Sequence, residues 1–153
     1  MKKTWSPALT STPRTIERAP LDLVVPFTTP RLTEAALRAA SRLGGGLDSA
    51  VRIVKVQVVP FPLDLRYSPV PVEFIEKQME HLCGEVLSLP HSAEIRLARE
   101  FEGGLRGALR FRSMIVLATK KRPWRTRTER LADSLRAGGY TVVLVYDEGK
   151  NNA

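Results

Sequence analysis

The fold of this chain is decided by residues 21–30, Leu21-Asp22-Leu23-Val24-Val25-Pro26-Phe27-Thr28-Thr29-Pro30. The apolar first part is rich in β-branched side chains, as a buried strand is, and Pro26 marks its end. From residue 31 to 43, apolar side chains recur at intervals of three and four, which predicts a helix with one apolar face that includes Leu43. Thr29 before Pro30 fits an N-cap followed by proline at the first helical position.

The same alternation continues along the chain. Strands are predicted at residues 51–59, 92–99, 113–119 and 140–146, and helices at residues 72–89, 103–110 and 128–137. The helix over 72–89 has an apolar stripe that includes Phe74 and Leu89, and Cys83 is expected in the core. The helix over 103–110 is expected to be short and weakened by glycine, and its glycines lack the spacing of a phosphate loop.

Alternating strands and helices with short connections predict an α/β fold with three layers, α/β/α, and a five-stranded, mostly parallel sheet. Residues 1–20, with three prolines among polar and basic side chains, are predicted to be a flexible N-terminal tail. Residues 21–148 are predicted to form one domain, and residues 149–153 a C-terminal tail. The length of 153 residues is usual for a single domain.

Positive charge is concentrated in one part of the chain. The net charge is +8, and residues 99–136 carry eleven basic and four acidic groups, which gives +7. Such clustering attracts anions, although a solvated basic surface is an equally weighted interpretation. Cys83 is the single cysteine, which excludes an internal disulfide, and no apolar run approaches the roughly 20 residues of a membrane span. The start has no signal-peptide core, so a cytoplasmic protein without a membrane partner is expected.

The order of elements resembles the universal stress protein family. The local match is Leu23–Pro30 followed by Thr33-Glu34-Ala35-Ala36-Leu37-Arg38-Ala39-Ala40, which looks like the first strand, turn and helix of that family. The order of elements matches over residues 21–147, and residue-level similarity is confined to 23–40. The resemblance implies the strand order 3-2-1-4-5. It also implies a homodimer that pairs through the last strand, residues 141–147, whose apolar edge would otherwise be unpaired.

Two departures from the family bear on ligand binding. Where ATP-binding members have an aspartate after the first strand, this chain has Thr28, which offers one hydroxyl and no carboxylate. Those members follow the fourth strand with a glycine-rich segment whose amides wrap phosphates. Here residues 118–127 contain no glycine, so that backbone cradle is absent. No cofactor is therefore assigned on motif grounds, and ATP or another nucleotide remains an alternative.

A basic segment stands where the glycine motif would be. Its candidate ligand-binding residues, together with Thr28 at the crevice, are Lys120, Lys121, Arg122, Trp124, Arg125 and Arg127. At the carboxyl end of a central strand, these side chains are predicted to contact an anionic, phosphate-bearing ligand directly. Trp124 would stack on a base or cover a guanidinium. The opposing interpretation is a solvated loop with Trp124 packed on the sheet edge.

No catalytic constellation is visible in the sequence, so an enzyme is not predicted. His81 and Cys83 point in different directions on a helix, and no Gly-x-Ser-x-Gly motif occurs. The leading hypothesis is a non-catalytic, stress-related or regulatory module that does not bind ATP in the family's usual way. The alternatives are a nucleotide- or phosphate-ligand-binding protein that uses loop 120–127, and a nucleic-acid or polyanion binder.

Overall fold

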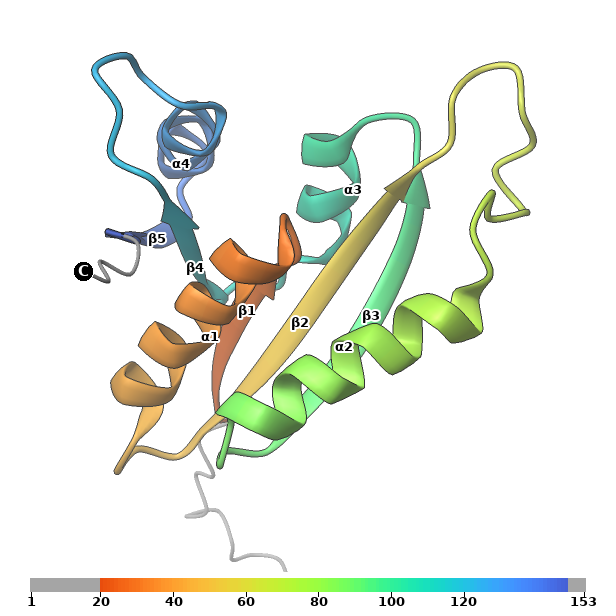
Figure 1. The fold of residues 1–153 in the computed structure, drawn as a ribbon. Helices are drawn as coiled ribbons and strands as arrows, with labels where there is room; N and C mark the ends of the chain where they lie inside the picture. Colours follow the sequence, from red (N-terminus) through yellow and green to blue (C-terminus); the bar gives the residue numbers. More distant parts are fainter. Residues whose placement is uncertain (1–19, 149–153) are drawn as a thin grey trace, which may run out of the picture.

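The computed structural model describes residues 20–148 as five strands alternating with four helices (Figure 1). The predicted tails at residues 1–19 and 149–153 lie outside the described residues. The elements in chain order are β1 (Leu21–Pro26), α1 (Pro30–Gly44), β2 (Ser49–Val58), α2 (Val72–Val86), β3 (His91–Ala98), α3 (Phe101–Ala108), β4 (Met114–Thr119), α4 (Arg127–Ala137) and β5 (Thr141–Tyr146).

The five strands form one sheet with the order β3-β2-β1-β4-β5. Every pairing in it is parallel, so the predicted three-layer fold and strand order are confirmed, and the sheet is more uniformly parallel than expected. Strand β1 lies in the middle of the sheet, β2 and β3 follow on one side of it, and β4 and β5 lie on the other side. This change of side places a topological switch point between β1 and β4.

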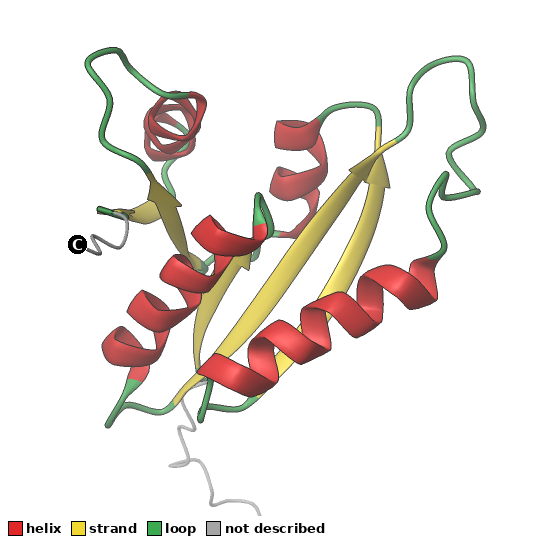
Figure 2. Ribbon diagram, viewed as in Figure 1, coloured by secondary structure: helices red, strands yellow, loops and turns green. Residues whose placement is uncertain are grey.

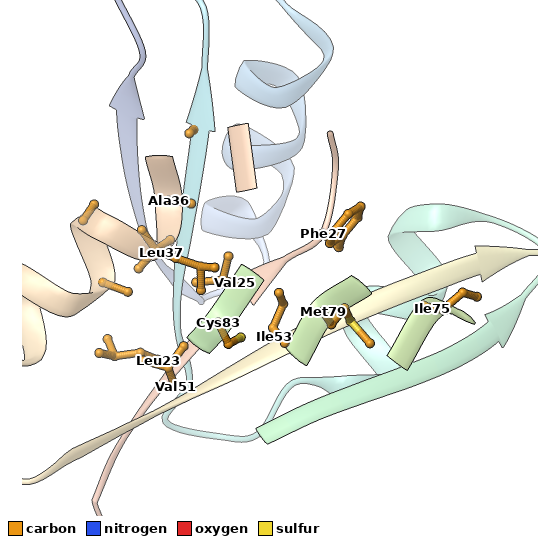
Figure 3. Packing of buried hydrophobic residues seen from close by; sticks show 14 residues of the cluster. Leu23, Val25, Phe27, Ala36, Leu37, Val51, Ile53, Ile75, Met79 and Cys83 are labelled. Atoms are coloured by element: carbon orange, nitrogen blue, oxygen red, sulfur yellow. The ribbon is translucent and has the colours of Figure 1, made fainter. Parts of the chain in front are cut away.

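Helices cover both faces of the sheet (Figure 2). On one face, α1 and α2 pack on the odd-numbered side chains of β1 and β2, such as Leu23, Val25 and Ile53. Figure 3 shows Ile75, Met79 and Cys83 in a row along α2 on this face. On the other face, α3 and α4 pack on the alternate side chains. The central strands are buried on both sides, which is why they read as continuous apolar runs.

The first helix begins and ends as the sequence predicts. The Thr29 side chain accepts a hydrogen bond from the Leu32 amide at 3.2 Å, and Pro30 is the first helical residue. The helix ends at Gly44, and Gly46 adopts a φ of 81°, which favours glycine.

One glycine of α3, Gly104, is required by the packing of the helix on the sheet. A Cβ on Gly104 would lie 2.6 Å from Val56 Cγ1 and 2.8 Å from Ala98 Cβ, so this helix approaches the sheet more closely than alanine permits. The helix starts at Phe101, two residues before its predicted start. The close approach of the helix to β2 and β3 explains glycine at position 104, whereas a Cβ on Gly103 or Gly107 would meet other atoms only at 3.9 Å and 3.8 Å.

Three predictions about apolar faces or element ends are wrong in detail. Phe74 is 61% exposed rather than part of the buried stripe of α2, because Ile75, Met79 and Cys83 set the buried face and Phe74 lies well to one side of it. Leu43 at the end of α1 is 39% exposed. Helix α2 ends at Val86, where the Leu87 amide still bonds to the Cys83 carbonyl and Leu87 itself is extended.

An ionic network crosses three strands near their amino ends. Arg52 of β2, with a side chain that is 8% exposed, donates two hydrogen bonds to Asp22 of β1 and one to Glu94 of β3. Ser113 donates to Asp22 at 2.6 Å. Burial raises the pKa of Asp22, but the hydrogen bonds from Arg52 and Ser113 outweigh it and bring the pKa below its ordinary value. These charges are paired, so the network is structural.

Candidate functional site

The sheet opens at its switch point. Strands β1 and β4 pair only through Leu23 with Met114 and Val24 with Ile115, that is, the middle of β1 with the amino end of β4. By contrast, β1 pairs with β2 along its whole length. The carboxyl halves of β1 and β4 therefore diverge, as Figure 1 shows, where β4 leans away from β1. Crevices at the carboxyl ends of parallel strands are where α/β sheets bind ligands.

A cleft of about 780 Å³ occupies this opening, and we call it the switch-point cleft. It straddles the carboxyl edge of the sheet, with side chains from β2, α3 and α4 and from the turn between β1 and α1. Its lining residues are Phe27, Thr28, Thr29, Leu32, Lys55, Val56, Phe101, Glu102, Arg127, Thr128, Arg130, Leu131 and Ser134. The volume is that of a site for a small molecule, and the mixture of aromatic, aliphatic and convergent polar groups is usual for one.

The charges in the switch-point cleft are mainly positive. Lys55, Arg127 and Arg130 line it, and Glu102 is its single carboxylate. The Lys55 ammonium lies 5.0 Å from the centroid of the Phe27 ring, a cation–π contact that holds the lysine over the end of β1. Arg130 donates to the Arg125 carbonyl at 3.3 Å. The Arg127 side chain makes no hydrogen bond or ion pair with any residue from 20 to 148, which leaves its guanidinium available to an anion.

The carboxylate of Glu102 is occupied by a network that joins α3 to α4. Glu102 Oε2 accepts hydrogen bonds from Arg106 Nη2 at 2.8 Å and from Ser134 Oγ at 2.6 Å. Arg106 Nη2 also donates to the Ser134 carbonyl at 3.1 Å. The hydrogen bonds from Ser134 and Arg106 lower the pKa of Glu102, so this group is ionised and is a poor proton donor or base at neutral pH. The network fixes the two helices on either side of the cleft.

The start of α4 carries its own capping carboxylate. Thr126 accepts a hydrogen bond from the Glu129 amide, and Glu129 Oε1 accepts from the Thr126 amide at 2.7 Å, which completes a capping box. Tyr146 Oη donates to Glu129 Oε2 at 2.7 Å. The amide of Thr126 and the hydroxyl of Tyr146 lower the pKa of Glu129. Because this carboxylate sits at the helix terminus, an anion in the cleft depends on side chains rather than on a backbone cradle.

The structure divides the sequence-predicted site residues into two groups. Thr28 and Arg127 line the switch-point cleft. The Thr28 amide donates to the buried Thr33 hydroxyl at 2.9 Å, which fixes the turn after β1. The other predicted residues do not line the cleft and are exposed on the loop between β4 and α4; they are Lys120, Lys121, Arg122, Trp124 and Arg125. Arg125 forms an ion pair with Asp133, and Trp124 is 63% exposed, so it is not packed on the sheet edge.

Lys55, Arg130, Glu102 and Ser134 were not among the predicted site residues. Lys55 could have been predicted from the sequence, because a charged residue in the carboxyl half of an apolar strand is unusual. The fold places this half of the strand beside the switch point, where ligands bind. The other three lie on ordinary polar faces of helices. Their position at the cleft depends on how α3 and α4 pack, and this packing cannot be predicted from the local sequence.

Comparison with protein-family models and with curated proteins found no match for this chain. Among residues 20–148, no group of three or more histidine, cysteine, aspartate or glutamate side chains is arranged to hold a metal ion. None of the helices in this part of the chain has the length and apolar character needed to cross a membrane.

Proposed function

We propose that this chain is a universal-stress-protein-like regulatory module that binds a small anionic ligand, of the nucleotide class, in the switch-point cleft. The observation that carries the proposal is the position of Lys55 and Arg127, which approach the cleft from elements on the two sides of β1. A phosphate group between them would meet two cations, while Val56, Phe101 and Leu131 provide an apolar surface for a base or another ring.

The mode of binding differs from the family's usual one. Thr28 can exchange one hydrogen bond with a ligand hydroxyl, where a carboxylate would accept two. The phosphate would be held by Lys55, Arg127 and Arg130 in place of glycine amides. Side chains that must be ordered on binding give lower affinity than a preorganised backbone loop, so we expect micromolar rather than nanomolar binding.

The proposed role is non-catalytic. Glu102 is the carboxylate of the cleft, and it is committed to Arg106 and Ser134. The two histidines lie elsewhere, His81 on α2 beside Glu85 and His91 at the amino end of β3. Among the described residues, these positions leave the cleft without a free carboxylate or histidine to act as general acid or base, which supports the non-catalytic part of the proposal. The proposed setting of this regulatory, stress-related module is the cytoplasm. Incubation of the purified chain with ATP should give no hydrolysis above background, and turnover that depends on Glu102 would contradict this part of the proposal.

Calorimetric titration with ATP, AMP and cyclic AMP tests the ligand. We expect saturable binding of at least one of them, and a loss of about tenfold or more in affinity for Arg127→Gln and for Lys55→Gln, because each variant removes one charge-assisted contact. Arg112→Gln is the matched control, since Arg112 is exposed in the connection before β4, at the opposite end of the sheet. Nucleotide binding that is equally strong in all four proteins, or absent from the wild type, would contradict the assignment.

We also propose a homodimer that pairs through residues 141–147. The support is that β5 is an edge strand, bonded on one side to β4, and that its sequence is apolar. Sedimentation equilibrium at micromolar concentration should then give twice the chain mass of 17.1 kDa. A strict monomer at that concentration would overturn the dimer without affecting the proposed ligand site.

A further inference from the structure

The loop between β4 and α4, residues 120–126, forms a second cationic surface, outside the switch-point cleft. We call it the β4–α4 loop; it leaves β4 and returns to α4 at the upper left of Figure 1. Lys120, Lys121 and Arg122 are exposed on it. Within residues 20–148, none of these three side chains makes an ion pair or a hydrogen bond. Adjacent cations without internal counterions create a local positive potential, which attracts polyanions.

The base of the β4–α4 loop is fixed. The hydroxyls of Thr119 and Thr126 lie 2.8 Å apart and join the end of β4 to the start of α4. Arg125 is paired with Asp133, and its carbonyl accepts a hydrogen bond from Arg130 at 3.3 Å. These contacts hold the two ends of the loop. The loss of loop conformational entropy on binding a partner is therefore smaller than for a loop with free ends.

Trp124 gives the β4–α4 loop a second kind of contact. Its side chain is 63% exposed, and no cation from the described part of the chain covers its ring. An exposed indole offers a large planar face, and bases of single-stranded nucleic acids stack on such faces without regard to sequence. Proteins recognise a single strand with two elements: cations that contact its phosphates and an aromatic side chain that stacks on a base. The β4–α4 loop offers both.

A lipid surface fits the β4–α4 loop less well. Insertion into a bilayer interface requires a substantial apolar area, and residues 120–127 offer only Trp124 and Pro123 among charged and polar side chains. A duplex has no unstacked base for the indole. The loop chemistry therefore favours a flexible strand whose bases are accessible.

We propose that the β4–α4 loop binds single-stranded nucleic acid, with Lys120, Lys121 and Arg122 on the phosphates and Trp124 stacked on one base. The surface is separate from the switch-point cleft, so this function is independent of the ligand proposed for the cleft.

The chain has two tryptophans, and Trp5→Phe leaves Trp124 as the only one. In this background, titration with single-stranded RNA and DNA of about 12 nucleotides should quench the tryptophan emission to saturation. Three phosphate contacts predict that the logarithm of the binding constant falls with the logarithm of salt concentration with a slope of about −2. No saturable binding, or binding without quenching, would overturn the proposal.

Two variants separate charge from stacking, with binding followed by the anisotropy of a labelled strand. The triple variant Lys120→Gln, Lys121→Gln, Arg122→Gln should lose most of the salt dependence and at least about tenfold in affinity. Trp124→Ala should also lose about tenfold, with an unchanged salt slope. Unchanged affinity in either variant, with an unchanged melting temperature, would refute the assigned role of those residues.

The matched control is Phe111→Ala with Arg112→Gln. Phe111 is 93% exposed and, with Arg112, presents an aromatic ring beside a cation in the connection before β4, at the other end of the sheet. This variant should bind the strand normally, and so should Arg127→Gln, which tests the cleft.

Tighter binding to phosphatidylserine vesicles than to the strand would identify a membrane surface instead. Equal binding of a duplex and of heparin would show a non-specific polyanion site. Either result would overturn the proposal.

Discussion

The hydroxyl of Thr119, the last residue of β4, lies 2.8 Å from the hydroxyl of Thr126, the N-cap of α4. This one contact closes the base of the loop that carries the exposed cations Lys120, Lys121 and Arg122. It also positions the capping box of α4, because Thr126 is hydrogen-bonded to the Glu129 amide at the same time. Thr119 is 2% exposed, so its hydroxyl needs a partner inside the protein.

Thr126→Ala should lower the free energy of unfolding by about 1–2 kcal/mol. The change removes the N-cap acceptor and leaves the buried Thr119 hydroxyl without this partner. Urea denaturation measures the effect, and Thr126→Ser is the control, since serine keeps the hydroxyl and should restore most of the stability. An alanine variant as stable as the wild type would show that the contact is not maintained in solution.

Gly104→Ala should destabilise the chain by about 1–3 kcal/mol, because the new methyl group would overlap Val56 and Ala98 and force α3 away from the sheet. Gly103→Ala, one residue earlier in the same helix, is the matched control. Its Cβ would approach only the Glu100 carboxylate, at 3.9 Å, so this variant should be neutral or up to about 1 kcal/mol more stable. Equal stability of the two variants would contradict the close packing of α3.

The stability of the chain should fall in acid, in part through Asp22. Its pKa is below the ordinary value in the folded state, so its contribution is present above the unfolded pKa of about 4 and is lost as the pH falls through the folded pKa. Asp22→Asn should cost about 3 kcal/mol at neutral pH, because Arg52 loses one of its two carboxylates. Urea midpoints between pH 7 and pH 2 should show a shallower acid dependence in the variant. Parallel pH profiles would rule out this role of Asp22.

Cys83 should be unreactive in the folded chain. Burial raises the pKa of its thiol to about 11, so at pH 8 only a small fraction is thiolate. The side chain is 1% exposed, so a reagent cannot reach the sulfur in the folded chain. A thiol-reactive disulfide reagent should label the native protein slowly and the urea-unfolded protein rapidly, at one thiol per chain. Equally fast labelling of both states would place Cys83 outside the core.

The fold could be predicted because its signals are local. Thr29 and Pro30 mark the start of α1, and the apolar strand that precedes them could only be central, because it is buried on both faces. The order of strands and helices followed from the same periodicities. Phe74 was misassigned because a single turn at the start of a helix does not reveal which side faces the sheet.

The candidate site could be predicted only in part. Thr28 and Arg127 line the cleft, since both follow the carboxyl ends of the strands that flank the switch point, and their role in ligand binding stays a prediction. The basic residues before Arg127 were expected to converge there as well. They do not, because the Thr119–Thr126 contact closes the loop at its base and the segment between these residues is exposed to solvent.

The sequence by itself determined the alternation of strands and helices, the helix caps and the concentration of positive charge, because these depend on residues within a few positions of one another. Only the tertiary structure decided that β1 and β4 separate, that Lys55 and Arg127 share one cleft, and that Trp124 is exposed apart from it. Each of these depends on long-range packing, since strand pairing and the docking of α3 and α4 bring together side chains that are distant in sequence.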